Sequence, residues 1–164
     1  MQKSKPYLFL LLGAILYTLG FPNIFNLYIP MAPILGTSII LYYLLELPHW
    51  KSRLGYYLFY NLIITALSFY WITATLQEFG NIPFFIAAIM NSLYSLLLNP
   101  QYLVFIAMLA INDRYKLIDI KKWNKTGFFS FLAALLFTSL EYFIPQQFPV
   151  MLGQPWIIFS NYLG

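Results

Sequence analysis

Side chains that could do chemistry are few in this sequence of 164 residues. It contains no cysteine, and His49 is the one histidine. This composition excludes a disulfide, a thiolate metal site and a thiol nucleophile within the chain, and one histidine cannot form a multi-histidine metal site. We also find no Ser-His-Asp set, Gly-rich phosphate loop or two-metal carboxylate cluster. The residues alone therefore predict no catalytic centre, no metal and no cofactor.

The carboxylates differ in their surroundings. Asp113 and Asp119 lie among lysines and Glu46 ends an apolar run, so solvation accounts for all three. Glu78 follows a longer apolar run and is either a solvated loop carboxylate or part of a site. Glu141 lies inside the last apolar run, where an ionisable group is either functional or hydrogen-bonded at headgroup depth.

The elements that must position these side chains follow from the composition. Hydrophobic residues make up 61% of the sequence and charged residues 9%, against about 45–50% and about 25% in soluble domains. A chain so poor in charge cannot cover a water-facing surface, and disordered chains are polar. At about 20 residues per crossing, the sequence predicts an all-α, polytopic membrane bundle of about five helices.

Five apolar segments are expected to cross the membrane: 7–21, 27–47, 54–76, 82–111 and 127–144. The first is interpreted as an uncleaved helix rather than a signal peptide, because no small-x-small site follows it. Pro30 and Pro33 are placed in the first turns of the second helix, and the fourth is expected to be one tilted helix kinked at Asn99-Pro100. Polar residues within the segments are interpreted as forming hydrogen bonds between helices; they are Asn61, Thr65, Ser68, Asn91, Ser92 and Ser95.

Residues 1–145 thus form the predicted bundle, and residues 146–164 a periplasmic loop or the start of a further element. The apolar run 156–159 favours the second interpretation, so we expect Gly164 not to be the natural C-terminus.

The basic residues occur in three places, before the first segment, between the second and third, and between the fourth and fifth. They are Lys3, Lys5, Lys51, Arg53, Arg114, Lys116, Lys121, Lys122 and Lys125. By the positive-inside rule, this alternation predicts a cytoplasmic N-terminus and an outer C-terminus. The net charge of +4 fits contact with anionic headgroups, and without a basic folded module we expect no nucleic-acid partner.

Three stretches, taken in order, resemble the bacterial apolipoprotein N-acyltransferases. The first contains Gly13-Ala14, Phe21-Pro22-Asn23, Phe25-Asn26-Leu27 and Ala32-Pro33; the second contains Tyr70-Trp71-Ile72, Phe79-Gly80 and Pro83; the third contains Glu141-Tyr142, Pro145, Phe148-Pro149 and Gly153. None is specific alone, but their order and their placement at predicted helix ends match the family over essentially the whole sequence.

The resemblance implies a function in lipoprotein maturation at the bacterial inner membrane. These enzymes move an acyl chain from a phospholipid through a cysteine thioester to the α-amine of an apolipoprotein. The Cys, Glu and Lys of the catalytic set lie in a nitrilase-like domain. Without a cysteine, this chain resembles the family's membrane part and is not expected to be catalytic on its own. A nitrilase-like partner domain, a phospholipid and a lipoprotein are the implied partners.

The resemblance also implies a site. We expect the outer ends of the third to fifth helices to form a side opening for lipid-bearing substrates, lined by Trp71, Glu78, Phe79, Gly80, Glu141, Phe148 and Pro149. The alternative is a stand-alone, non-catalytic membrane scaffold or lipid-binding protein. A small transporter or channel is less favoured, because the sequence has neither an internal repeat nor a charged pathway.

Overall fold

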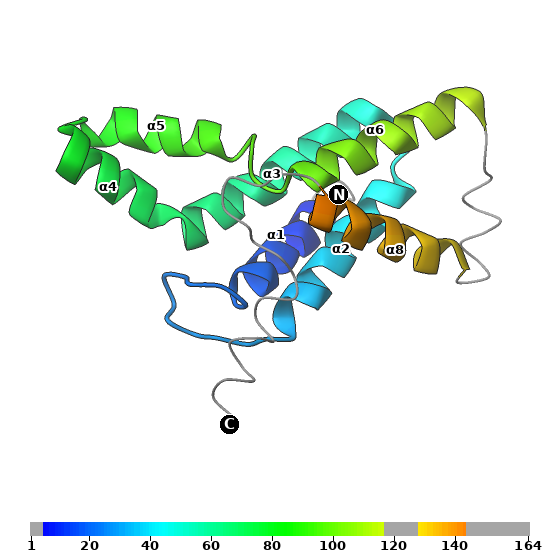
Figure 1. Ribbon diagram of the computed structural model, residues 1–164, viewed down its shortest axis with the longest axis horizontal. Helices are drawn as coiled ribbons and strands as arrows, with labels where there is room; N and C mark the ends of the chain where they lie inside the picture. The colour runs from blue at the N-terminus through cyan, green and yellow to red at the C-terminus, as the bar shows by residue number, and fades with distance from the viewer. Residues whose placement is uncertain (1–4, 117–127, 144–164) are drawn as a thin grey trace.

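The computed structural model describes residues 5–116 and 128–143, which form helices and loops without strands (Figure 1). The described helices are α1 (Lys5–Thr18), α2 (Ala32–Glu46), α3 (Trp50–Ser68), α4 (Tyr70–Gly80), α5 (Phe84–Tyr94), α6 (Pro100–Tyr115) and α8 (Phe128–Phe143). The predicted all-α class is confirmed for these residues. Helix α8 occupies residues 128–143 of the predicted segment 127–144.

Helices α1 and α2 cross in close backbone contact at two glycines. A Cβ atom built on Gly36 would lie 2.4 Å from the carbonyl oxygen of Gly13 and 2.6 Å from the backbone nitrogen of Tyr17. No side chain fits in that space, so glycine at position 36 is what allows the two helices to approach. Gly13 belongs to the first of the three stretches that carry the family resemblance.

A row of aromatic rings crosses the core and links four helices. The Tyr17 ring of α1 lies 6.0 Å from that of Tyr60 in α3, which lies 6.1 Å from that of Tyr102 in α6. The Phe137 ring of α8 follows at 4.7 Å from Tyr102. All four side chains are buried, so aromatic burial contributes much of the packing between these helices.

Four helix ends meet at what we call the basic end, because Lys51, Arg53, Arg114 and Lys116 lie there. The Tyr56 ring lies 5.2 Å from Tyr7 and 6.1 Å from Tyr43, which brings together the starts of α1 and α3 and the end of α2. The buried Arg53 donates from Nε to the carbonyl of Leu44, at 2.8 Å, and from Nη1 to the Asp113 carboxylate, at 2.5 Å. This ion pair adds the end of α6.

The opposite end carries the connection between α1 and α2, residues 19–31, which has no charged residue. We call it the outer loop. Asn23 fixes its shape by donating from Nδ2 to the carbonyls of Phe21 and Leu27 and by accepting from the Phe25 N–H. The predicted second segment, 27–47, becomes helical only at Ala32, so placing Pro30 in its first turn was wrong. Likewise α1 ends at Thr18 rather than continuing to residue 21.

The predicted segment 54–76 is divided between two helices. Within the described residues no one helix has both the length and the apolarity expected of a membrane crossing; α3 and α4 meet both criteria only as a pair, bent by 61°. Tertiary contacts hold the bend at Phe69. The Leu67 carbonyl accepts the N–H of Ile24, and the Phe69 carbonyl accepts from Asn91 Nδ2.

The predicted single helix 82–111 is likewise two helices, α5 and α6. The chain leaves the helix at residues 95–99, and Asn99 takes a left-handed backbone (φ 54°) directly before Pro100 starts α6. The Leu98 carbonyl accepts from Tyr57 and Asn61, at 2.9 and 2.7 Å. A proline kink was predicted here, but buried polar groups of α3 stabilise a full break.

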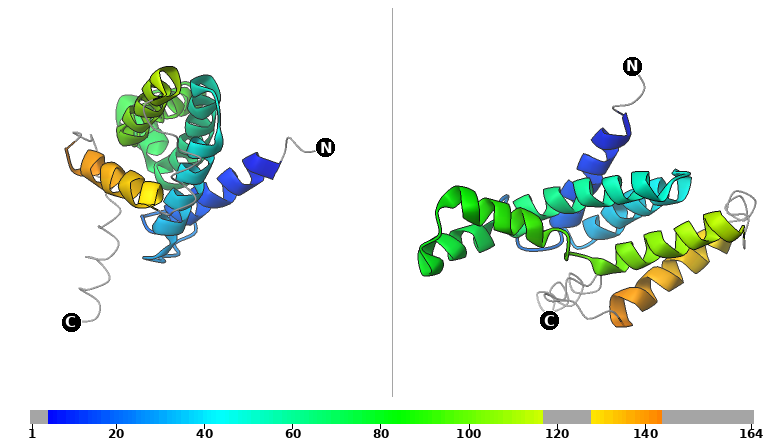
Figure 2. Two further views of the ribbon diagram at one scale, coloured as in Figure 1. Left: turned by 90° about the vertical axis from the view of Figure 1, so that its right-hand side faces the viewer. Right: turned by 90° about the horizontal axis from the view of Figure 1, so that it is seen from above.

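Helices α4 and α5 lie side by side and form an arm, residues 70–94, that extends away from α1, α2, α6 and α8 (Figures 1 and 2). The arm leaves the bundle at the bend after α3 and returns at the break before α6. In chain order the arm therefore connects α3 to α6, which run antiparallel. The Arg53–Asp113 ion pair joins these two helices at the ends that are farthest from the arm.

Candidate functional site

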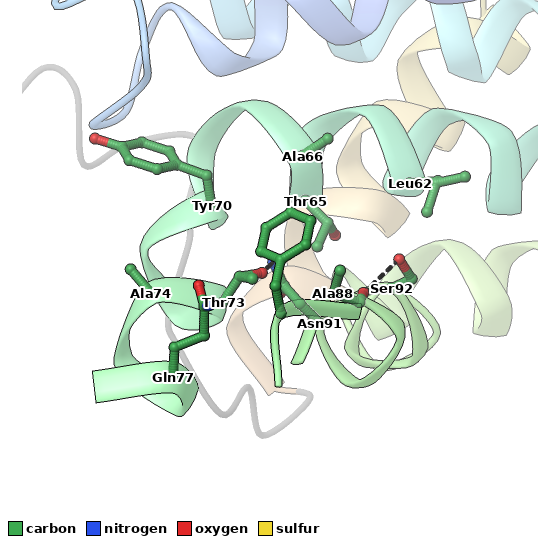
Figure 3. A pocket seen from close by; sticks show the side chains of 11 residues that line it. Leu62, Thr65, Ala66, Tyr70, Thr73, Ala74, Gln77, Ala88, Asn91 and Ser92 are labelled. Atoms are coloured by element: carbon green, nitrogen blue, oxygen red, sulfur yellow. Dashed lines mark hydrogen bonds between the residues drawn. The ribbon is translucent and has the colours of Figure 1, made fainter. Parts of the chain in front are cut away.

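An open pocket of about 360 Å³ lies between the inner side of the arm and the last turns of α3 (Figure 3). Three helices supply its lining, which comprises Leu62, Thr65 and Ala66 of α3, Tyr70, Thr73, Ala74 and Gln77 of α4, and Phe84, Ala88, Asn91 and Ser92 of α5. The small side chains among them leave room for a cavity between the helices, and the apolar side chains form most of the pocket wall.

Asn91 sets the geometry of this pocket. Its side chain is 5% exposed, and its Nδ2 donates to the Phe69 carbonyl at 3.0 Å and to Thr73 Oγ1 at 3.1 Å. One side chain of α5 thus binds both the bend between α3 and α4 and the first turns of α4. Because buried amide groups require hydrogen-bond partners, these bonds stabilise the bend and keep the pocket walls at a fixed separation.

Polar oxygen atoms are buried next to the pocket. Asn91 Oδ1 and the hydroxyl oxygen of Thr65, both from residues of the lining, have no hydrogen-bond partner among the described groups. Each would gain from a polar partner in this low-dielectric surrounding. The described lining has hydroxyl and amide groups but no carboxylate, imidazole, amine or guanidinium. Such a pocket is suited to binding and positioning an apolar molecule rather than to acid–base catalysis.

The structure places four of the predicted site residues on α4 but outside this lining. Trp71, Glu78, Phe79 and Gly80 are all exposed, and the Phe79 ring is 80% exposed near the tip of the arm. The residues of α4 that line the pocket occupy another face of the same helix. Their role in a side opening stays a prediction.

The remaining predicted site residues lie on another helix or outside the described part of the chain. Glu141 belongs to α8, which packs on α6. Phe148 and Pro149 lie outside the described residues. The sequence therefore placed four of the predicted site residues near the pocket, but it predicted neither α4 as a separate helix nor the face of α4 that lines the pocket.

Sequence reasoning assigned Thr65, Asn91 and Ser92 to bundle-stabilising hydrogen bonds and did not assign them to a site. Their position could have suggested a site, because each lies in one of two apolar segments that are joined by a short turn at residues 81–83. The bend at Phe69, which opens the space between them, had no local signal.

Comparison with family models, curated proteins and solved structures finds no match to this chain. The family resemblance accordingly remains a prediction from the three stretches of sequence.

Proposed function

We propose that this chain is the membrane part of an enzyme similar to the apolipoprotein N-acyltransferases of the bacterial inner membrane. In this proposal the pocket between α3, α4 and α5 admits an acyl chain of a lipid-bearing substrate from the side of the bundle. The chain positions the lipid, and a nitrilase-like partner domain provides the chemistry.

The observation that carries the proposal is the place of the pocket between two parts of one motif. Tyr70-Trp71-Ile72 begins α4 at the bend, and Phe79-Gly80 ends it before Pro83. The inner face of the helix between them forms one wall of the pocket. Of the residues that suggested an acyltransferase, Tyr70 lines this mainly apolar pocket, and Trp71, Phe79 and Gly80 lie on the same helix outside the lining.

The chemistry of the lining supports an acyl chain as the occupant. Leu62, Ala66, Ala74, Phe84 and Ala88 offer apolar contact, and burial of each methylene of a lipid chain contributes about 0.8 kcal/mol. The thioester step requires a thiol, and these 164 residues contain none. The contribution of the chain is therefore the orientation of lipid substrates next to a thiol supplied by the partner domain.

The test is the acylation state of lipoproteins in cells from which this chain is deleted. N-terminal lipopeptides are analysed by mass spectrometry, and we expect diacylglyceryl-cysteine with a free α-amine to accumulate. Expression of the intact chain should restore the third acyl chain. Full N-acylation in the deletion strain would overturn the proposal and leave the non-catalytic lipid-binding alternative.

A matched pair of variants tests the pocket. Ala88→Trp places an indole in the pocket, whereas Ile89→Trp places the same ring one residue further on, at a side chain that is 60% exposed and outside the lining. In the complemented strain we expect Ala88→Trp to reduce N-acylation at least about tenfold, equivalent to about 1.4 kcal/mol. Ile89→Trp should restore it fully. Equal restoration by two variants of equal abundance would exclude the pocket from the function.

A further inference from the structure

The start of the α4–α5 arm is level with the outer loop. The backbone N–H of Ile24, in that loop, donates to the carbonyl of Leu67, two residues before the bend, at 3.0 Å. Tyr70, the first residue of α4, shares a groove with Phe21, Asn23 and Tyr28 of the same loop. Irregular backbone that faces lipid is not tolerated in the hydrocarbon region. If the bundle spans the membrane, α4 therefore starts at the interface where α1 and α2 are connected.

The arm returns to the bundle near the same level. Asn99, immediately before α6, accepts at Oδ1 a hydrogen bond from the hydroxyl of Tyr17, at 3.1 Å. Tyr17 is the penultimate residue of α1. Both attachment points of the arm thus lie near the outer ends of other helices. In a bundle that spans the membrane, α3 would lead up to the arm and α6 would lead away from it.

The direction of the arm agrees with this placement. Helix α3 has 19 residues and is about 28 Å long, close to the thickness of about 30 Å of a hydrocarbon core. Helix α4 is bent by 61° from α3, so it runs more across the axis of α3 than along it. Its eleven residues, all described, include none that is buried, and the right-hand view of Figure 2 shows the arm extending beyond the other helices.

The two helices of the arm differ in the side chains they expose. The exposed hydrophobic residues of α5 outside the pocket form one apolar surface, made by Phe85, Ile86, Ile89, Met90 and Leu93. The exposed positions of α4 are mixed: Thr75, Gln77 and Glu78 are polar, whereas the aromatic Tyr70, Trp71 and Phe79 lie at its two ends. A hairpin with one apolar helix and one partly polar helix has the two-sided character of elements that lie at a membrane surface.

We propose that the α4–α5 arm is a lipid-binding hairpin that lies along the outer surface of the inner membrane, with α5 toward the acyl chains and α4 toward water. The partner of its apolar surface is the outer leaflet of the bilayer. The inference rests on the membrane setting of the proposed function but not on acyl transfer, so a chain without any role in acylation can still bind lipid in this way.

Site-directed spin labelling tests the direction of the arm, and the native chain, which has no cysteine, serves as the unlabelled background. Single variants Gly55→Cys and Leu62→Cys mark two exposed positions of α3, and Trp71→Cys and Glu78→Cys mark two exposed positions of α4. Each pair is seven residues apart, about 10 Å along a helix axis. Depth is measured in phospholipid proteoliposomes by power saturation with oxygen and a nickel chelate.

We expect the depth difference of the α4 pair to be at most about half that of the α3 pair, since the bend is 61°. Equal or larger depth differences for α4 would mean that α4 continues the crossing, and would overturn the proposal. This readout is independent of lipoprotein acylation, so its failure is distinguishable from failure of the proposed function.

A second pair of labels tests which helix contacts lipid. We expect a label at Ile89→Cys, on the exposed surface of α5, to collide mainly with oxygen, which concentrates among acyl chains. A label at Thr75→Cys, exposed on α4, should collide more with the water-soluble nickel chelate. Low collision of the Ile89 label with both reagents would indicate a protein contact instead. That result, or the reverse order of the two labels, contradicts the proposal.

Discussion

Glycine has opposite physical roles at two helical positions of this chain. At Gly36 the absence of a side chain allows α1 and α2 to approach until backbone atoms are nearly in contact. At Gly55 a Cβ atom would meet no neighbouring atom within 4 Å, so glycine there only adds conformational entropy to the unfolded chain. The two positions are therefore a natural pair for measuring the contribution of the helix crossing.

Gly36→Ala is expected to lower the free energy of unfolding by about 1–3 kcal/mol, the usual effect of overpacking. The cause is the contact of the new methyl group with the Gly13 carbonyl and the Tyr17 backbone nitrogen, neither of which can turn away. Reversible unfolding in detergent micelles, followed by circular dichroism, measures the effect.

Gly55→Ala is the control, and it should leave stability unchanged or raise it by about 0.5–1 kcal/mol, since alanine is the better helix former. If both variants lost stability equally, the crossing at Gly36 would not be a tight one.

Polar residues within the apolar segments were only partly understood from the sequence. The prediction that they join helices is confirmed for Asn61 and Asn91, which donate to backbone carbonyls of other elements. It is wrong for Ser92 and Ser95, which donate to carbonyls three or four residues earlier in their own segment. A short serine side chain reaches its own helix more readily than a neighbouring one.

At the scale of elements, both breaks in the predicted helices depend on donors far away in the sequence. The break after α5 leaves the carbonyls of Leu96 and Leu98 without partners in a helix, and the hydroxyl of Tyr57 lies 3.1 and 2.9 Å from them. Tyr57 belongs to α3, about 40 residues earlier. The break is therefore stabilised by the packing of α3 and not only by Pro100.

Tyr57→Phe should accordingly destabilise the protein by about 1–2 kcal/mol, because it keeps the ring and removes the hydroxyl that these buried carbonyls share. Thermal unfolding in detergent gives the change. Tyr42→Phe removes a hydroxyl from an exposed ring on α2 and should stay within about 0.5 kcal/mol of the parent. Similar effects of the two substitutions would show that the break does not depend on α3.

The same dependence explains which elements were predictable. Asn99-Pro100 is a local signal, so the sequence indicated an interruption there, although it did not indicate how complete that interruption is. The bend at Phe69 has no proline or glycine beside it. It is fixed by Ile24 and Asn91, which approach from the outer loop and from α5. A hydropathy pattern contains no information on such contacts, so segment 54–76 was predicted as one helix.

At the scale of the whole molecule, the arrangement of charge is the feature that sequence and structure share. The alternation of basic segments predicted that the segments around Lys51 and Arg114 lie on one side. The described helices bring these segments together through the Arg53–Asp113 ion pair. The outer loop and the arm, at the other end, contain one charged residue between them, Glu78. Such a polarised bundle is what the positive-inside rule selects.

This polarity predicts the labelling pattern of single cysteines in cells, again without background from the cysteine-free parent. Ile24→Cys in the outer loop and Glu78→Cys on the arm should react with a membrane-impermeant maleimide once the outer membrane is permeabilised. Ser52→Cys and Tyr115→Cys, both exposed at the basic end, should react only after the inner membrane is also opened. None of the four substitutions alters a basic residue, so the charges that set orientation are unchanged.

The four labels separate the possible outcomes because each end of the bundle is marked on two different elements. If the pairs react in the reverse order, the basic end faces outward and charge does not orient this bundle. If Ile24→Cys and Glu78→Cys report opposite sides, the arm crosses the membrane, which contradicts its attachment to the outer loop at Leu67. The expected pattern requires both that the membrane separates the two ends and that α3 and α6 cross it as an antiparallel pair, so that residues 52 and 115 are on the same side.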